Sequence, residues 1–157
     1  MAFLLHGLDP ALFAPWFALS DGELAARGGK RVFADSSPGY PCRVSLADAA
    51  VGDEMVLVPF EHHAVHGPYR ASGPVYVRRA ASEPLVLDRV PDVLARRLLS
   101  VRGYDGAGMM AHADVVDGRE LAASLERLVE RRDISYVHVH YAKPGCFACR
   151  VTAAGRG

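Results

Sequence analysis

Hydrophobic and polar residues alternate along the C-terminal half of the chain, and this alternation predicts three β-strands. The predicted strands cover residues 98–104, 109–116 and 134–142. Residues Asp105 to Gly108 separate the first two and contain the Asp-Gly turn signal, so we expect an antiparallel hairpin there.

Side chains at i and i+2 share one face of a strand, which divides these three segments into two sets. We expect one set to face the core: Leu99, Val101, Ala111, Ala113, Val115, Val137 and Val139. The opposite set collects Ser100, Arg102, Tyr104, His112, Asp114, Tyr136, His138 and His140. That second face is either a solvated sheet surface or a functional site, and its His, Tyr, Arg and Asp content favours a site.

The rest of the chain predicts shorter elements. We expect buried or extended strands at 43–46, 54–60, 74–79 and 146–151, short helices within 10–19, 21–26 and 90–97, and a connection at 61–68. Pro59 limits the far end of the second strand to an edge or a bulge.

The clearest helix is predicted at about residues 118–131. Asp117 is its cap, Glu120 completes a capping box, and Leu121, Leu125, Leu128 and Val129 form an apolar stripe. We therefore predict a single α+β domain over residues 1–157, with a largely antiparallel sheet of five to seven strands and this helix packed on one face. The elements do not repeat as βαβ units, which disfavours a doubly wound parallel sheet.

The amino-acid composition limits the classes of binding partner that we expect. The 157 residues include 18 Lys+Arg and 18 Asp+Glu, a balance that gives no electrostatic footprint for nucleic acid or an anionic membrane, so we expect neither partner. The N-terminus lacks a basic segment typical of a secretory signal, and the three cysteines cannot all pair within one chain. We expect a cytoplasmic protein.

Histidine suits proton transfer, metal binding or anion binding because its unperturbed pKa lies near neutrality. His138 and His140 share one strand face, and His62, His63 and His66 lie in the predicted connection. The chain has enough histidines and cysteines to form a zinc site. However, residues 62–66 are not an HExxH motif, since Glu61 precedes the histidine pair. Arg43, Arg70 and Arg102 suit a carboxylate or phosphate, or simply local salt bridges.

The cysteines allow two further interpretations. Cys146 and Cys149 form one Cys-x-x-Cys pair, which falls short of a zinc ribbon and does not open a helix as a thioredoxin-like motif does. Arg43 beside Cys42 favours a thiolate nucleophile, whereas a buried, inert cysteine is the commoner case.

Several phrases resemble the bacterial family called domain of unknown function 1203. They are residues 8–13, 38–46, 61–62, 68–74, 98–102, 137–140 and 145–146, in the same order. The resemblance supplies no activity. It implies that a set of residues lies at family-typical positions: Asp35, Cys42, Arg43, His62, Tyr69, Arg70, Arg102, His138, His140 and Cys146. The resemblance also implies that His63, His66 and Cys149 are peculiar to this chain, which weakens the triple-histidine and Cys-x-x-Cys interpretations.

The leading hypothesis is a small-molecule site for an anionic ligand, with hydrolysis or another group transfer as its enzymatic form. His138, His140 and Cys42 are the candidate catalytic residues, and the candidate ligand-binding residues are Arg43, His62, Tyr69, Arg70, Arg102 and Tyr104. The alternative is a non-catalytic interaction module, and a symmetric homodimer is compatible with either. We expect no cofactor and no metal, because nothing in the sequence shows that His62, His138 and His140 converge.

Overall fold

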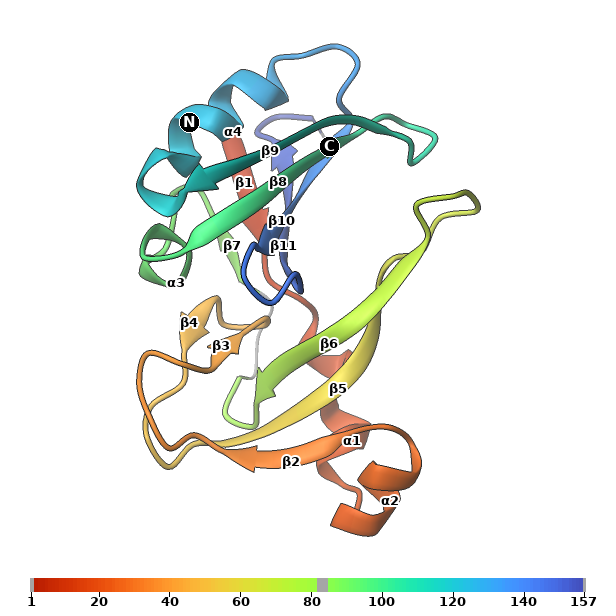
Figure 1. The fold of residues 1–157 in the computed structure, drawn as a ribbon, viewed down its shortest axis with the longest axis vertical. Helices are drawn as coiled ribbons and strands as arrows, with labels where there is room; N and C mark the ends of the chain where they lie inside the picture. Colours follow the sequence, from red (N-terminus) through yellow and green to blue (C-terminus); the bar gives the residue numbers. More distant parts are fainter. Residues whose placement is uncertain (1, 82–84, 157) are drawn as a thin grey trace.

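The computed structural model describes residues 2–81 and 85–156 and arranges its strands in two sheets (Figure 1). The six-stranded sheet has the order β7-β1-β11-β10-β8-β9 and contains β1 Phe3–His6, β7 Val86–Leu87, β8 Leu98–Tyr104, β9 Met110–Asp117, β10 Tyr136–Tyr141 and β11 Phe147–Ala153. The five-stranded sheet has the order β2-β5-β6-β3-β4 and contains β2 Lys30–Phe33, β3 Pro41–Cys42, β4 Ala47–Asp48, β5 Glu54–His63 and β6 Ala71–Arg78. Within the described residues, β3 with β6 is the only parallel pairing.

The helices are short, and the predicted α+β class is confirmed. They are η1 Pro10–Leu12, α1 Ala14–Phe17, α2 Asp21–Ala26, α3 Asp92–Ala95, η2 Gly118–Glu120 and α4 Leu121–Val129. The predicted main helix is η2 followed by α4, and its apolar stripe packs with Val137 and Val139 of the six-stranded sheet. Asp117 caps its first turn, with its side chain accepting from the backbone N–H of Arg119. The strands, expected in one sheet, divide over two.

Strand β5 corrects the prediction of a connection at residues 61–68. It runs on through Pro59 to His63, so Glu61, His62 and His63 are strand residues. Pro59 is tolerated because β2 pairs only with residues 54–57, which leaves β5 without a neighbour on that side beyond Leu57. The register with β6 shifts between Phe60 and His63, so a bulge re-aims the two histidines.

Three other local predictions differ from the structure. Residues 43–46, expected to be extended, form turns after the two-residue strand β3. The helix expected at 90–97 is the single turn α3, because Pro91 acts as its N-cap. The faces of β9 are exchanged: Asp114 lies opposite Val101, and Val116, rather than Val115, packs on the core. His112 therefore lies on the α4 side, 3.4 Å from the Arg131 guanidinium, and not beside His138.

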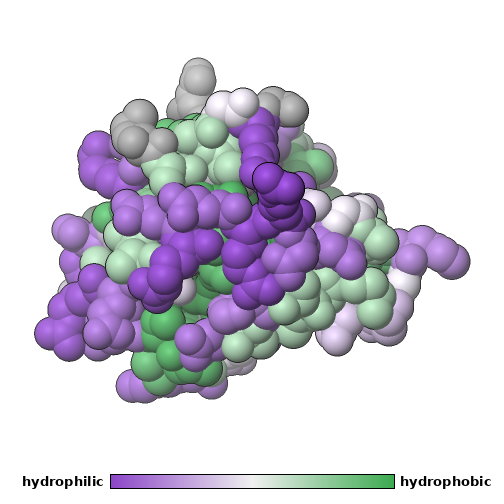
Figure 2. Space-filling model, turned by 90° about the horizontal axis from the view of Figure 1, so that it is seen from above, coloured by the Kyte–Doolittle hydropathy of each residue, from purple (hydrophilic) through white to green (hydrophobic). Residues whose placement is uncertain are grey.

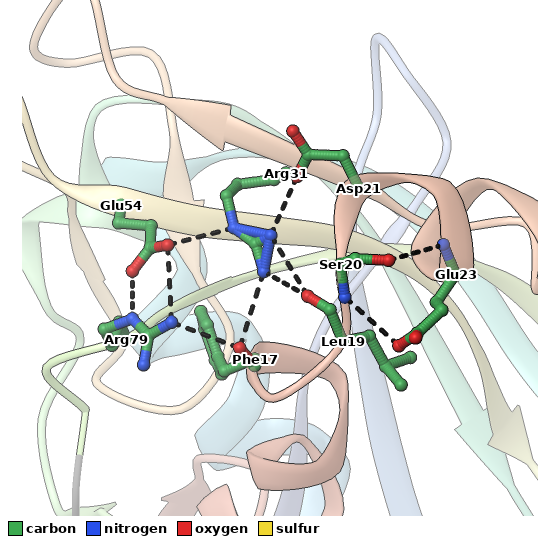
Figure 3. A network of polar contacts seen from close by, with 8 residues as sticks. All are labelled: Phe17, Leu19, Ser20, Asp21, Glu23, Arg31, Glu54 and Arg79. Atoms are coloured by element: carbon green, nitrogen blue, oxygen red, sulfur yellow. Dashed lines mark hydrogen bonds and ion pairs between the residues drawn. The ribbon is translucent and has the colours of Figure 1, made fainter.

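The N-terminal helices are fixed to the five-stranded sheet by a polar network (Figure 3). Ser20 caps α2 in a capping box with Glu23. Arg31 of β2 donates to the Leu19 carbonyl at 2.8 Å and pairs with Asp21 and Glu54. Glu54 also pairs with Arg79, so one carboxylate joins β2 to the end of β6. This network holds the N-terminal helices against the edge strand β2.

Each sheet has its own apolar cluster, and the two sheets meet along β5, β10 and β11. One cluster packs under α4, and the other lies between the five-stranded sheet and the N-terminal helices. Seen from above, hydrophilic residues cover much of the surface, with hydrophobic residues visible between them (Figure 2). Within the described residues, no helix has the length and apolarity needed to cross a membrane.

Candidate functional site

The face predicted to be either solvated or functional is buried between the two sheets. His138 and His140 of β10 are each 1% exposed. The opposite wall is β5, whose bulge aims His62 and His63 at them. The solvated-face interpretation is therefore wrong for β10, because the second sheet covers that face.

His62, His138 and His140 form a trio. One ring nitrogen from each lies within 4.8 Å of those of the other two. The ring centroid of His62 is 5.0 Å from that of His140 and 6.2 Å from that of His138. Neutral imidazoles at this spacing can bind one transition metal ion.

The unpaired nitrogens of the trio are the most informative detail. His62 Nδ1, His138 Nδ1 and His140 Nε2 are buried and have no hydrogen-bond partner among the described residues. A buried polar atom without a partner costs about 1–3 kcal/mol, and native proteins keep few of them. Three such atoms in one cluster are available to bind a ligand.

The other nitrogen of His140 supports this interpretation. His140 Nδ1 lies 3.0 Å from the carbonyl oxygen of Gly145, which can only accept, so Nδ1 carries the proton. Nε2 is then the unprotonated nitrogen, with its lone pair free. Metal-binding histidines are commonly fixed in this way by a backbone carbonyl.

Packing also fixes the rings. Phe147 of β11 stacks on His62, with centroids 5.4 Å apart and planes 8° apart, and makes edge contacts with His138 and His140. Phe60 of β5 lies against the same phenyl ring. The trio therefore has a rigid apolar floor, which excludes water from one side.

Burial keeps the trio neutral. Desolvation, with like charges on His63 and His140 next, lowers the pKa of His138 to about 2. Desolvation likewise lowers the pKa of His140 to about 4, although its hydrogen bond to Gly145 acts in the opposite direction. The pKa of His62 is also lowered, by burial and by the charge of Arg102. Neutral rings are the form that binds metal.

His63 belongs to a neighbouring aromatic cluster and not to the trio. Its Nδ1 lies 2.7 Å from the Tyr69 carbonyl and its Nε2 lies 2.6 Å from the Tyr136 hydroxyl, so both nitrogens are satisfied. Tyr104 packs on His63, with ring centroids 4.1 Å apart, and burial raises the pKa of the Tyr104 hydroxyl. This cluster closes the side of the site nearest the β5–β6 hairpin.

Arg102 is the cation beside the trio. It lies directly across from His138 in the β8–β10 ladder, so their side chains share a face. Its Nε donates to Ser100 Oγ at 3.3 Å, and within residues 2–81 and 85–156 it has no carboxylate partner. A half-buried guanidinium of this kind suits an anionic group.

The other candidate residues lie elsewhere. Cys42 is buried in the apolar cluster of the five-stranded sheet, and its sulfur accepts from the backbone N–H groups of Ser45 and Arg78. Arg70 is exposed and paired with Glu61. Tyr69 contributes its backbone carbonyl to His63, and its ring is partly exposed. The structure thus brings together His62, His138, His140, Arg102 and Tyr104, and it leaves Cys42 and Arg70 outside that group.

Arg43 is buried beneath the turn between β10 and β11, where it contacts Cys146 and Phe147. Its Nη2 lies 2.9 Å from Cys146 Sγ, and its Nε donates to the Phe147 carbonyl at 2.7 Å. Phe147 itself was not predicted as a site residue. One clue in the sequence could have identified Phe147 as a site residue: it follows Cys146 at the start of the last strand, on the histidine side of the sheet.

The comparisons with known proteins agree with the resemblance in the sequence. A family model described as "Protein of unknown function (DUF1203)" matches residues 39–153, a segment that contains the trio, Arg43, Arg102 and Cys146. No curated protein and no solved structure matches the chain.

Proposed function

The chain belongs to the DUF1203 family of proteins of unknown function, and we propose that it binds a divalent transition metal ion through His62, His138 and His140. The observation that carries this proposal is the convergence of three histidines, one ring nitrogen from each within 4.8 Å of the others, each of which also has a buried ring nitrogen without a hydrogen-bond partner among the described residues. The expectation of a metal-free protein rested on the absence of any sign that these residues converge. Their proximity removes that reason.

The donor set favours zinc or a neighbouring ion. Three neutral imidazoles suit Zn²⁺, Co²⁺, Ni²⁺ or Cu²⁺ and are a poor match for Mg²⁺ or Ca²⁺, which prefer oxygen ligands. Three protein ligands leave a fourth position for water or substrate, as in catalytic zinc sites. We propose Zn²⁺ as the resident ion.

Arg102 defines the class of ligand. A small anion at the fourth position would meet the metal and the guanidinium of Arg102 together. A metal ion in such a site lowers the pKa of its bound water towards 7, so hydrolysis of a small anionic substrate is the reaction class that we propose. Cys42 takes no part in this proposal, because its sulfur lies in the core of the five-stranded sheet.

Metal binding is tested by titrating chelator-treated protein with Co²⁺ and recording the visible absorption of the bound ion. We expect one equivalent, displaced by Zn²⁺. His62→Ala, at the half-buried member of the trio, should weaken binding by at least about 100-fold. His66→Ala is the matched control, because His66 is exposed in the adjacent loop and should leave binding unchanged.

Other outcomes would overturn the proposal. Wild-type protein that binds less than a tenth of an equivalent of either ion would do so, as would equal affinity in wild type and His62→Ala. Circular dichroism of each variant separates lost binding from lost folding. Inorganic phosphate should shift the cobalt spectrum of wild type and not of Arg102→Met, and hydrolysis of p-nitrophenyl phosphate should depend on both Zn²⁺ and Arg102.

A further inference from the structure

A second candidate site lies in a cavity of about 480 Å³ that does not include the histidine trio. It lies where the turn between β10 and β11 meets β3 and the end of α3. Its polar lining is dominated by four cationic side chains and one thiol: Arg43, Arg96, Arg97, Lys143 and Cys146.

The charges of this lining are incompletely balanced. Asp48 forms a two-point pair with Arg97, at 2.7 and 3.0 Å, and Arg96 lies 3.8 Å from both Asp48 and Asp92. Arg43 and Lys143 have no carboxylate within 4.0 Å in the part of the chain that the structure describes. The cavity therefore holds a surplus of positive charge, which raises the local concentration of anions.

Arg43 places one of these positive charges in the protein interior. Its side chain is 1% exposed, and its three partners are the carbonyls of Phe147 and Pro41 and the sulfur of Cys146. The guanidinium groups of Arg43 and Arg97 both pack on the Tyr141 ring, at 4.9 and 5.4 Å from its centroid. The two cations are thus held rigidly on one wall.

Cys146 contributes the thiol among the residues that line the cavity. It is half-buried and lines the cavity, whereas Cys42 and Cys149 are buried in apolar clusters. A thiol beside a guanidinium in a partly exposed, cationic environment is typical of reactive cysteines. Burial also raises the pKa of the Cys149 thiol to about 12, so Cys149 does not compete.

We propose that this cavity binds a small organic anion, a carboxylate or a phosphate, and that Cys146 Sγ reacts with an electrophilic carbon of that anion. In the step, the sulfur forms a bond to the carbon while the bond from carbon to its leaving group breaks. The leaving group departs with the electron pair, and the thiol proton passes to solvent. This site is independent of the proposed metal centre.

The test compares an anionic and a neutral alkylating agent of the same shape. Iodoacetate carries a carboxylate and iodoacetamide does not, and both transfer a two-carbon group to sulfur with loss of iodide. We expect the ratio of the iodoacetate rate to the iodoacetamide rate at Cys146 to exceed that of free glutathione by at least about fivefold, and to fall as NaCl is added. Peptide mass spectrometry should place the label on Cys146, and Cys146→Ser should abolish it.

The two lysines of the chain supply a matched pair of variants. Lys143→Met removes a charge from the cavity and should lower the ratio about threefold, with little change in the iodoacetamide rate. Lys30→Met removes a charge from the far edge of the five-stranded sheet and should leave the ratio unchanged. Arg96→Met, at an exposed lining residue, is the second test of the same charge effect.

Competing anions identify the preferred headgroup. Phosphate and acetate at equal ionic strength should protect Cys146 from iodoacetate to different extents. The anion that protects better identifies the anionic group, phosphate or carboxylate, that the cavity prefers. The proposal fails if the ratio equals that of glutathione, if label appears on Cys42 or Cys149 first, or if neither Lys143→Met nor Arg96→Met lowers the ratio. Cobalt titration of Cys146→Ser and Lys143→Met should match wild type, which separates failure here from failure of the metal centre.

Discussion

Arg43 joins the two sheets through a single side chain. It belongs to the turn after β3 in the five-stranded sheet, and it donates to the Phe147 carbonyl at the start of β11 in the six-stranded sheet. The planar guanidinium matches this set of acceptors because its donors point in fixed directions. One residue thereby satisfies two buried carbonyls.

Replacing Arg43 tests this link. We expect Arg43→Met to lower the free energy of unfolding by about 3 kcal/mol, because the buried carbonyls of Pro41 and Phe147 lose their donors. Arg43→Lys should recover only part of that loss, since an ammonium group cannot reproduce the fork. Urea unfolding measures both, and Arg132→Met, outside any described ion pair, is the control. A loss below about 1 kcal/mol in Arg43→Met would contradict the assigned role.

At the scale of elements, the approach of α3 to η2 depends on a glycine. A Cβ atom on Gly118 would lie 2.0 Å from the Leu94 carbonyl oxygen and 2.7 Å from the Ala95 carbonyl. The obstacle is backbone, which cannot rotate away. The backbone N–H of Gly118 also donates to the Arg97 carbonyl at 2.8 Å, so this glycine sets the position of α4 relative to α3.

Two glycine-to-alanine substitutions should therefore act in opposite directions. Gly118→Ala is expected to destabilise the fold by about 2 kcal/mol or more, because the helices must separate. Gly22→Ala should be neutral or stabilise it by about 0.5 kcal/mol, since Gly22 lies within α2 with nothing near its missing Cβ. Thermal melting of the two variants side by side is sufficient. Equal melting temperatures would show that the α3–η2 contact is not tight.

The elements that could be predicted from the sequence are those whose signals are local. The hairpin of β8 and β9 and the apolar stripe of α4 each depend on residues a few positions apart. The strands β1 and β2 were missed because they are short and each is defined by distant partners. The extension of β5 beyond Phe60 was missed for a related reason: a strand end with a proline, followed by paired histidines, is typical of a loop.

At the scale of the whole molecule, the candidate site depends on how the two sheets meet. Alternation in β10 correctly separates Val137 and Val139 from His138 and His140. It does not show that β5 covers the histidine face. Alternation assigns each side chain to one face of the strand, but it does not identify the element that packs on that face. The interpretation of Cys42 as a nucleophile activated by Arg43 depended in the same way on contacts that the sequence does not show. Its neighbour Arg43 could be found in the sequence, but the guanidinium reaches Cys146 instead.

The buried histidines should make the stability of the metal-free protein depend on pH. The folded-state pKa values of His138 and His140, lowered by burial to about 2 and about 4, lie below the value of about 6.5 expected in the unfolded chain. Below pH 6.5 the unfolded state therefore binds more protons than the folded state, and stability falls as pH falls until the folded-state pKa is reached.

Each of these two histidines should lower the free energy of unfolding by about 2 kcal/mol between pH 7.5 and pH 5. Urea unfolding at the two pH values, with a chelator present, measures their sum together with the contributions of His62 and His6, whose pKa values are also lowered by burial. His140→Phe should reduce the fall by about 2 kcal/mol, because the phenylalanine ring cannot take up a proton in the unfolded state, and comparing one variant with itself at two pH values cancels any change in packing. His66→Ala, at an exposed position, should retain the full effect. An equal fall in wild type and His140→Phe would show that His140 is not held neutral in the fold, and would remove one of the three nitrogens on which the metal site depends.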